Sequence, residues 1–480
     1  MEETTTTTTT KRVLLFPFMA QGHLIPFSQL AHLISLRNNH SVTLVNTPSN
    51  ILTLRSILPS SSTVRLSSLP FNPSDHGLPP GQESTDSLPF HLFFPLFLST
   101  ESLRPAFTRF VSDALSSDPT SPLSIIADPF LGWTVDVAKD LGVFHAFFLT
   151  SGAWGSAVFL SLWTHHPLPW SDSDDLALPN RPNVRLRRSQ VTPLLLHGDD
   201  DDNPEFAFFH RQIAQFCKSD GVIVNTAEGF ERSGVEFLKE ESGGMPVWAV
   251  GPLLRVPSTP LSDDTHIGWL AGHPPASVLY VSFGSMNTIS ASQMVELAMG
   301  LEASGTAFVW VIRPPIGFDF KVGFREEWLP EGFEERMREQ NRGVLIHGWA
   351  PQMEILSHAS TGAFLSHCGW NSVLESLCNG VPIVGWPIAG EQFYNSTMMV
   401  EEIGVCVEIA RGNGNESVVC REDVERIVRS VMMGGEGEEM RRKAREVGEV
   451  LRAAVGEGGA SVRAMDDFLR TALSTMAGKD

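Results

Sequence analysis

Short apolar runs alternate with segments of helical periodicity along most of this 480-residue chain. In the first half the runs are Arg12–Phe18, Val42–Asn46, Ser124–Asp128, Phe144–Thr150 and Gly221–Asn225. In the second half they are Ser277–Ser282, Ala307–Ile312, Gly343–Trp349, Ala363–His367, Pro382–Trp386 and Gly404–Ile409. Continuous apolar strands separated by helices form parallel sheets that helices cover on both faces. We therefore predict an α/β fold with two doubly wound domains facing each other across a cleft.

The chain is longer than a domain with a single hydrophobic core usually is, which favours two domains. We predict a disordered Thr-rich tail at 1–10, an N-terminal domain at 11–250, a linker at 251–275, a C-terminal domain at 276–455 and a C-terminal helix at 456–480. The linker is rich in Pro, Ser and Gly. Ser461 is a candidate cap for the last helix, which we expect to pack back on the N-terminal domain.

Charge and cysteine content restrict the partners and the compartment. The formal net charge of −20 argues against binding nucleic acid or an anionic membrane by bulk electrostatics, so an anionic ligand must be held by local dipoles rather than a basic patch. The five cysteines show neither disulfide-framework nor zinc-site spacing, which indicates a reducing compartment. The apolar stretch Pro89–Leu98 is about half the length needed to span a bilayer. We expect a cytoplasmic monomer without stable membrane insertion.

Polar and aromatic residues recur where the predicted strands end. They are His23, Asp128, Thr150, Ser285, Trp349, His367, Glu391 and Gln392. Ligands of open α/β sheets bind at the carboxyl ends of the strands, so these positions are candidates for the functional site. The acidic run Asp199–Asp202 is interpreted as a solvated loop rather than a metal site.

The segment His367–Gly380, HCGWNSVLESLCNG, predicts a strand, a tight turn and a helix that begins near Asn371. Free backbone N–H groups at Asn371 and Ser372 form an anion site at a helix N-terminus. Glu375 lies one turn deeper and is either a ligand for vicinal ribose hydroxyls or a solvated surface residue. The loop after the first strand, MAQGH, has a single glycine, which argues against a dinucleotide-binding site.

At these residues the sequence resembles the plant family-1 UDP-glycosyltransferases. Trp349–Gln392 is similar, without a break, to the C-terminal signature of that family, including WAPQ, HCGWNS, LE and the closing EQ. The resemblance extends through FPFMAQGHLIP, the strand ending at Asp128, GPL at Gly251–Leu253 and SFGS at Ser282–Ser285. It implies the twin-Rossmann GT-B fold, with the acceptor in the N-terminal domain and the UDP-sugar in the C-terminal domain.

The resemblance also implies a role for each matched position. Around the nucleoside it implies Trp349 stacked on uracil, Ala350 at the uracil edge, and Gln352 and Glu375 on the ribose. Around the diphosphate it implies Ser285, His367, Asn371 and Ser372. Around the hexose it implies Thr150, Trp370, Glu391 and Gln392, and a Gln at the last position usually accompanies glucose in such enzymes.

His23 is the predicted general base, because imidazole can take the proton of an acceptor hydroxyl near neutral pH. Asp128 would orient the ring and stabilise the imidazolium. The acceptor oxygen would then displace UDP in one step with inversion, and the helix N-terminus would absorb the charge that develops on the diphosphate. Neither of the two predicted sites carries an acidic cluster, so we expect no metal and no cofactor beyond the UDP-glucose co-substrate.

The acceptor is left open by the sequence. Two aromatic stretches, Ser87–Leu103 and Ala153–Pro169, are expected to build its pocket and would suit a flavonoid or other phenolic, or a triterpenoid or other terpenoid. Their aromatic residues are Phe90, Phe93, Phe94, Phe97, Trp154, Phe159 and Trp163. A protein that binds a nucleotide sugar or small ligand without turnover is the alternative from a different class. A sugar-nucleotide hydrolase and a retaining transferase are further alternatives.

Overall fold

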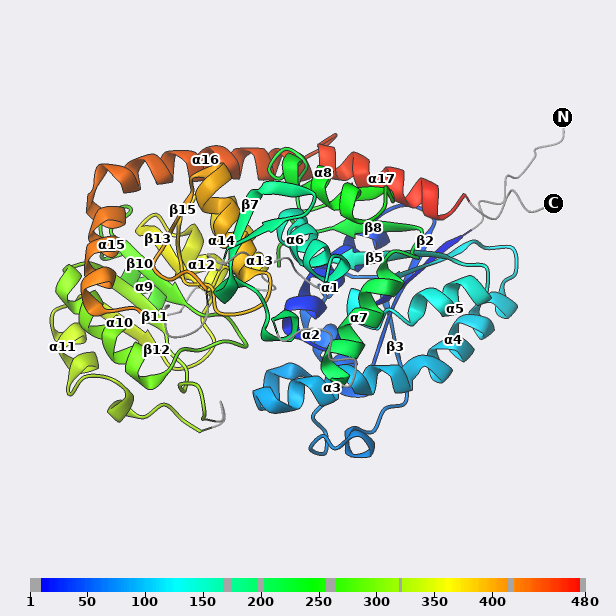
Figure 1. The fold of residues 1–480 in the computed structure, drawn as a ribbon, viewed down its shortest axis with the longest axis horizontal. Helices are drawn as coiled ribbons and strands as arrows, with labels where there is room; N and C mark the ends of the chain where they lie inside the picture. The colour runs from blue at the N-terminus through cyan, green and yellow to red at the C-terminus, as the bar shows by residue number, and fades with distance from the viewer. Residues whose placement is uncertain are drawn as a thin grey trace.

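The computed structural model describes residues 10–166, 175–196, 203–255, 265–318, 322–412 and 418–474. Two parallel β-sheets lie side by side, each flanked by helices (Figure 1). The N-terminal sheet has the strand order β3-β2-β1-β4-β5-β8-β9. Its strands are β1 (Lys11–Phe16), β2 (His40–Asn46), β3 (Arg65–Ser68), β4 (Leu123–Ala127), β5 (Phe144–Leu149), β8 (Gly221–Val224) and β9 (Val247–Ala249).

The C-terminal sheet has the order β12-β11-β10-β13-β14-β15, with every neighbouring pair parallel. Its strands are β10 (Val278–Ser282), β11 (Ala307–Val311), β12 (Gly343–Ile346), β13 (Thr361–Ser366), β14 (Ile383–Gly385) and β15 (Cys406–Glu408). An antiparallel pair, β6 (Asp175–Leu178) and β7 (Arg181–Arg187), stands apart from both sheets. The predicted fold class is confirmed, and each apolar run predicted from the sequence overlaps a strand.

Helices connect the strands and cover the sheets. The α-helices are α1 (Gln21–Ser35), α2 (Pro48–Ile57), α3 (Phe93–Ser99), α4 (Arg104–Ser117), α5 (Thr134–Asp140), α6 (Ala153–Thr164), α7 (Pro204–Phe216), α8 (Arg232–Glu241), α9 (Thr265–Leu270), α10 (Ala291–Ser304), α11 (Phe333–Glu339), α12 (Gln352–Ser357), α13 (Trp370–Cys378), α14 (Gln392–Met398), α15 (Arg421–Met433), α16 (Gly435–Val455) and α17 (Ala460–Ala472). Short helical turns are η1 (Pro73–His76), η2 (Thr85–Ser87), η3 (Phe90–Leu92), η4 (Thr100–Leu103), η5 (Pro129–Leu131), η6 (Arg188–Gln190), η7 (Pro193–Leu195), η8 (Glu326–Trp328) and the π-helical η9 (Met399–Ile403). Within the described ranges, none of the helices combines the length and the apolar character that crossing a bilayer requires.

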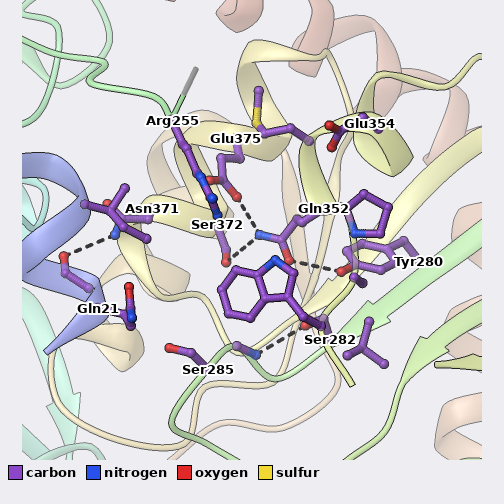
Figure 2. Close-up of a pocket in the computed structure, with 18 of the residues that line it drawn as sticks. Gln21, Arg255, Tyr280, Ser282, Ser285, Gln352, Glu354, Asn371, Ser372 and Glu375 are labelled. Carbon is purple, nitrogen blue, oxygen red and sulfur yellow. Dashed lines mark hydrogen bonds between the residues drawn. The ribbon is translucent and has the colours of Figure 1, made fainter. Parts of the chain in front are cut away.

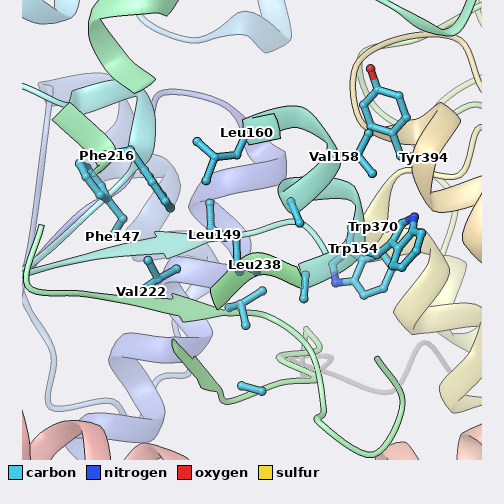
Figure 3. Close-up of a cluster of buried hydrophobic side chains, with 14 of the residues drawn as sticks. Phe147, Leu149, Trp154, Val158, Leu160, Phe216, Val222, Leu238, Trp370 and Tyr394 are labelled. Atoms are coloured by element: carbon cyan, nitrogen blue, oxygen red, sulfur yellow. The ribbon is translucent and has the colours of Figure 1, made fainter. Parts of the chain in front are cut away.

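One hydrophobic cluster continues from the N-terminal half into the C-terminal half. It includes Phe147 and Leu149 of β5 and Leu160 of α6, together with Trp370 of α13 and Tyr394 of α14 (Figure 3). Apolar side chains from both halves therefore share one buried environment. Because close-packed interiors are nearly incompressible, this shared core fixes how the two strand-end edges face each other.

The last helix lies on the N-terminal half. Figure 1 shows α16 along the C-terminal half and α17 continuing over the N-terminal sheet. The ring centroid of Phe468 on α17 lies 5.2 Å from that of Trp248 on β9, and the Trp248 indole donates to Asp467 Oδ2 at 2.9 Å. The expected cap is wrong: Gly459 precedes the first turn of α17, and Ser461 Oγ instead donates to the Gly251 carbonyl at 2.6 Å.

Candidate active site

The larger pocket, of about 330 Å³, lies between the strand-end edges of the two halves. The N-terminal half contributes Gln21, Gly22 and Ile25 of α1. The remaining lining residues follow the N-terminal half in sequence: Arg255, Tyr280, Ser282, Gly284, Ser285, Val311, Arg313, Gly348, Trp349, Ala350, Pro351, Gln352, Met353, Glu354, Asn371, Ser372 and Glu375. The structure thus brings together Ser285, Trp349, Ala350, Gln352, Asn371, Ser372 and Glu375, which the sequence placed in one site.

A hydrogen-bonded network centred on Gln352 forms one wall of the larger pocket (Figure 2). Gln352 Nε2 donates to Glu375 Oε2 at 2.5 Å and to Ser372 Oγ at 3.1 Å, while Tyr280 donates its hydroxyl to Gln352 Oε1 at 3.1 Å. Burial raises the pKa of Glu375 to about 7, against the opposing effect of the Gln352 bond. Glu375 is therefore a half-buried residue of the pocket wall that is bonded to Gln352, rather than a solvated surface residue. The Trp349 side chain is 62% exposed in the same pocket, so one ring face is free for a planar ligand.

Two glycines enclose the ring of His367 behind this pocket. A Cβ added at Gly284 would lie 2.6 Å from the ring, and one added at Gly369 would lie 2.4 Å from its Nε2 atom. Burial, reinforced by Arg313, lowers the pKa of His367 to about 4, so the imidazole is neutral at physiological pH. Its buried Nδ1 atom has no hydrogen-bond partner. Figure 2 shows Asn371 at the start of α13, where its side chain donates to the Gly22 carbonyl at 3.2 Å.

Two arginines in the larger pocket were missed from the sequence. Arg313 donates to the Ser285 carbonyl, and Arg255 lies near enough to Glu375 to lower the pKa of that carboxyl against the effect of burial. Both residues line the pocket. Two guanidinium groups therefore accompany the helix N-terminus in this pocket, in addition to the local dipoles that the sequence predicted. Arg313 lies two residues after the end of β11, so the rule that selected the other strand-end residues also applied to it.

A smaller pocket of about 160 Å³ surrounds His23 and Asp128. Its lining residues are His23, Asp128, Pro129, Phe130, Leu149, Thr150, Ser151, Ser156, Phe159, Leu160, Phe209, Gln212, Ile213, Phe216, Leu238 and Glu391. His23 is on the first turn of α1, whereas Asp128 follows β4. The strands β1 and β4 are parallel neighbours in the sheet, so His23 and Asp128, which follow them, meet at the same sheet edge although they are more than a hundred positions apart.

The His23 and Asp128 side chains form a short ion pair. His23 Nδ1 lies 2.6 Å from Asp128 Oδ2, and the other oxygen, Oδ1, accepts the Phe130 backbone N–H at 3.1 Å. Burial lowers the pKa of His23, but the charge of Asp128, its hydrogen bond and the charge of Glu391 outweigh burial and raise that pKa above 6.5. The Asp128 side chain is fully buried, and that of His23 is 23% exposed. The bond at Nδ1 leaves Nε2 as the ring atom available to a ligand.

Thr150 and Glu391 join the smaller pocket from opposite halves. Thr150 Oγ1 lies 3.5 Å from His23 Nδ1, and burial raises the pKa of Glu391, opposed by the charge of His23. Gln392 is arranged differently from the expectation. Its Oε1 atom accepts the backbone N–H groups of Ile388 and Ala389, both at 3.0 Å, so only its amide nitrogen can contact a sugar.

The indole of Trp370 packs between the two halves rather than in a pocket. Its Nε1 atom donates to the Asn225 carbonyl at 2.6 Å, its ring stacks on Phe230 at 6.0 Å, and a Cβ at Gly152 would lie 2.7 Å from it. Figure 3 shows Trp370 at the C-terminal side of the shared hydrophobic cluster. The only polar atom of the indole is already bonded, so the Trp370 side chain offers no hydrogen bond to a hexose. The Trp370 backbone stays a candidate.

The apolar wall of the smaller pocket differs from the predicted one. The stretch at Ala153–Pro169 contributes Phe159 and Leu160, but Trp154 and Trp163 are core residues. Phe97 stacks behind the wall on Phe18 at 4.5 Å; Phe93 and Phe94 also do not line it. The side chain of Phe90 lies outside the described part of the structure, as do residues 167–169 and the acidic run at 199–202. Among the described residues there is no group of three or more side chains that could hold a metal ion.

Much of the wall comes from α7, which the sequence did not indicate. Its contributions are Phe209, Gln212, Ile213 and Phe216. These residues are on the side of a helix, so a search for residues at strand ends passes over them. The apolar spacing of residues 206, 209, 213 and 216 is the available signal, but it marks only a buried helix face.

Comparisons with known proteins agree with this geometry. Residues 245–439 match the family model described as UDP-glucoronosyl and UDP-glucosyl transferase, and residues 10–255 match glycosyltransferase, N-terminal domain. UDP-glycosyltransferase 92A1 of Arabidopsis thaliana is 42% identical over 96% of this chain and 97% of its own length. Crocetin glucosyltransferase 3 of Crocus sativus is 45% identical over 88% and 90%. The structure of Phytolacca americana UGT2 with UDP-2-fluoro-glucose and pterostilbene superposes with a TM-score of 0.78 at 29% identity, covering 96% of this chain and 99% of its own.

Proposed function

The chain belongs to the plant family-1 UDP-glycosyltransferases, and on that premise we propose that it transfers glucose from UDP-glucose to a hydroxyl of a small apolar phenolic, with a flavonoid as the favoured acceptor. Membership makes it a GT-B transferase of the hexosyltransferase class. The larger pocket would hold the UDP-sugar and the smaller pocket the acceptor. The observation that carries the proposal is the His23–Asp128 pair, which lies in an apolar pocket beside a pocket suited to a nucleotide.

The larger pocket offers a partner for each part of UDP. The exposed ring of Trp349 can stack on uracil, and aromatic stacking on a base is worth about 1–3 kcal/mol. Gln352 and Glu375 would hold the ribose, since a carboxylate accepts hydrogen bonds from vicinal hydroxyls. The diphosphate would lie at the N-terminus of α13 beside Arg313, where backbone N–H groups and a guanidinium both favour negative charge.

The proposed reaction is a single displacement at the anomeric carbon. His23 Nε2 takes the proton of the acceptor hydroxyl as its oxygen bonds to that carbon, and the bond to the diphosphate breaks on the opposite side. Asp128 holds the imidazole by Nδ1 and stabilises the imidazolium that forms. The electron pair of the broken bond leaves with UDP, next to the N-terminus of α13. The configuration at the anomeric carbon is thereby inverted.

The lining of the smaller pocket supports a neutral, flat acceptor. Phe130, Phe159, Phe209 and Phe216 supply aromatic surface, and none of the described lining residues is a lysine or an arginine. Asp128 and Glu391 are carboxyl groups in the same pocket, which disfavours an anionic acceptor. A terpenoid is the second candidate, because aromatic walls also pack against aliphatic rings.

A donor and acceptor matrix tests the proposal. The protein would be assayed for UDP release with UDP-glucose, UDP-galactose, UDP-xylose and UDP-glucuronate, each against a flavonol, a simple phenol and a triterpenoid alcohol. We expect preference for UDP-glucose with the flavonol, and a product of inverted anomeric configuration by NMR. Preference for another donor refutes glucose, and turnover of the triterpenoid alone selects the terpenoid alternative. His23→Ala, which should bind UDP-glucose but lose about 10²–10⁴ in turnover, controls for contaminating activity.

We further propose that the protein acts as a monomer in the cytoplasm. All five cysteines are free thiols, and free thiols persist in reducing compartments. Light scattering on the purified protein and imaging of a fluorescent fusion in plant cells would test the two statements separately.

A further inference from the structure

Gln212 on α7 has an amide group that only half satisfies its hydrogen-bonding capacity. Its side chain lines the smaller pocket, and the residue is 6% exposed. Its Oε1 atom accepts the Gly132 backbone N–H at 2.8 Å. Its Nε2 group donates no hydrogen bond to any other described residue. A nearly buried amide donor therefore borders the cavity without a partner among the residues that the structure describes.

The structure fixes which end of this amide is available. A rotated amide would place its NH₂ group against the Gly132 N–H, two donors facing each other, so the oxygen stays on Gly132. The Gln212 amide lies close against the Gly132 backbone, because a Cβ added at Gly132 would lie only 2.5 Å from Gln212 Oε1. The helix that carries Gln212 is itself anchored, because Gln215 donates to Asp136 Oδ2 at 3.2 Å. The NH₂ group is thus a positioned donor rather than a loose one.

The surroundings of Gln212 on the pocket side are apolar. Phe130, Phe209 and Phe216 lie in the same wall, and none of them can accept a conventional hydrogen bond from an amide. A buried donor that stays unpaired when water is expelled is costly, whereas an oxygen on the ligand removes that cost. The chemistry of this wall selects for a ligand with an oxygen atom at that place.

We propose that Gln212 is an acceptor-specificity residue, whose amide N–H donates to a neutral oxygen of the acceptor remote from the hydroxyl that reacts. The inference rests on the proposed function, because it assigns the smaller pocket to the acceptor. The oxygen is a carbonyl, ether or second hydroxyl. A carboxylate is disfavoured by Asp128 and Glu391 in the same pocket. Acceptors of this kind are bifunctional: one oxygen lies at His23 and another at Gln212.

The test compares acceptors that differ only in the remote oxygen. The probes are 4-hydroxystilbene and its 3′-methoxy, 4′-methoxy and 4′-hydroxy derivatives, with UDP-glucose as donor. For the wild-type enzyme, kcat/KM should be about tenfold higher for the best oxygenated probe than for 4-hydroxystilbene, the usual net effect of one hydrogen bond between neutral groups. In Gln212→Met, which keeps the length of the side chain without the amide, this ratio should fall to near one.

Two further variants separate recognition from a structural role. Gly132→Ala leaves Gln212 in place but displaces its amide, so the ratio should fall as in Gln212→Met. Arg211→Met, next to Gln212 on α7 but solvent-exposed and outside the pocket lining, should keep the wild-type ratio. UDP-glucose binding and thermal melting report whether each variant is folded.

An unchanged ratio in folded Gln212→Met, or no preference in the wild-type enzyme, overturns the inference. Equal slowing of all four probes by Gln212→Met also overturns it, because a purely structural clamp on Gly132 would act on every acceptor alike. Absence of UDP release with every acceptor and donor overturns the proposed function itself.

Discussion

Replacing Asp128 by Asn tests the catalytic pair through the tautomer of His23. Oδ1 of Asp128 accepts the Phe130 N–H at 3.1 Å, and Oδ2 faces His23 Nδ1 at 2.6 Å. An Asn side chain keeps its oxygen toward Phe130, so its NH₂ group must face Nδ1. That nitrogen then has to accept, which moves the ring proton to Nε2, the atom that should take the acceptor's proton. The substitution therefore blocks the base as well as removing a charge.

The expected loss follows from the geometry of the pair. Two unit charges about 4 Å apart interact by about 4 kcal/mol at an effective dielectric constant of about 20, which corresponds to about three powers of ten in rate. The side chain of Asp128 is fully buried, so solvent screens little of this interaction. Together with the wrong tautomer, we expect kcat to fall by about 10³–10⁴. The KM for the acceptor should change little, because the shape of the pocket is kept.

Steady-state kinetics from pH 5 to 9 provide the assay, with Asp128→Ala as the matched control. The wild-type enzyme should lose activity as the pH falls through the raised pKa of His23, because the base must be neutral. In Asp128→Ala the raising effects of Asp128 are gone, so this acidic limb should shift to lower pH. The Ala variant leaves the tautomer free and should be at least as active as Asp128→Asn. A clearly faster Asn variant, or an effect confined to acceptor KM, refutes the reasoning.

Three further predictions concern the donor and the domain interface. The affinity for UDP-glucose should weaken as the pH falls below about 7, because Glu375 takes up a proton there and can accept fewer hydrogen bonds. Calorimetry should find that this pH dependence is absent in Glu375→Gln. Trp370→Phe keeps an aromatic ring but leaves the Asn225 carbonyl unpaired, at a cost of about 1–3 kcal/mol. The kcat should fall, whereas the Kd of UDP-glucose should stay nearly unchanged. A large rise in this Kd would instead place the indole at the donor. Activity should survive exhaustive EDTA treatment, since the α13 N-terminus and Arg313 would face the diphosphate in the proposed complex. Recovery of a lost activity by Mg²⁺ or Mn²⁺ would contradict this.

The sheets were predictable because their central strands are continuous apolar runs. The residues of β4, β8 and β10 are buried throughout, and such runs bounded by turn residues carry a clear signal. The strands β3, β7 and β9, which the sequence did not predict, lack such a continuous apolar run. The edge strand β3 has no fully buried residue, and β7 alternates arginines with apolar residues in an excursion outside both sheets. The strand β9 has three residues, too short for a periodic pattern.

The position of site residues was more predictable than their orientation. Strand ends meet at one edge of a parallel sheet, so His23 and Asp128 could be paired from sequence, and the helix after His367 could be assigned to an anion. Which way a side chain points depends on neighbours from other elements. Gln392 is turned by the backbone N–H groups of Ile388 and Ala389, and Trp370 by a carbonyl of the other half, contacts that no local pattern indicates.

These orientations tie His23, the proposed base, to the turn proposed to bind the diphosphate, across the cleft. Asn371, at the start of α13, donates to the carbonyl of Gly22, the residue before His23. Its neighbour Trp370 donates to the Asn225 carbonyl, so consecutive residues of the proposed diphosphate-binding turn both contact the N-terminal half. A displacement of the two halves that moved His23 from the anomeric carbon would have to break both bonds and open the shared hydrophobic cluster. Misplacement of reacting groups by about 1 Å can cost about 10²-fold in rate, so these contacts belong to catalysis as much as to folding.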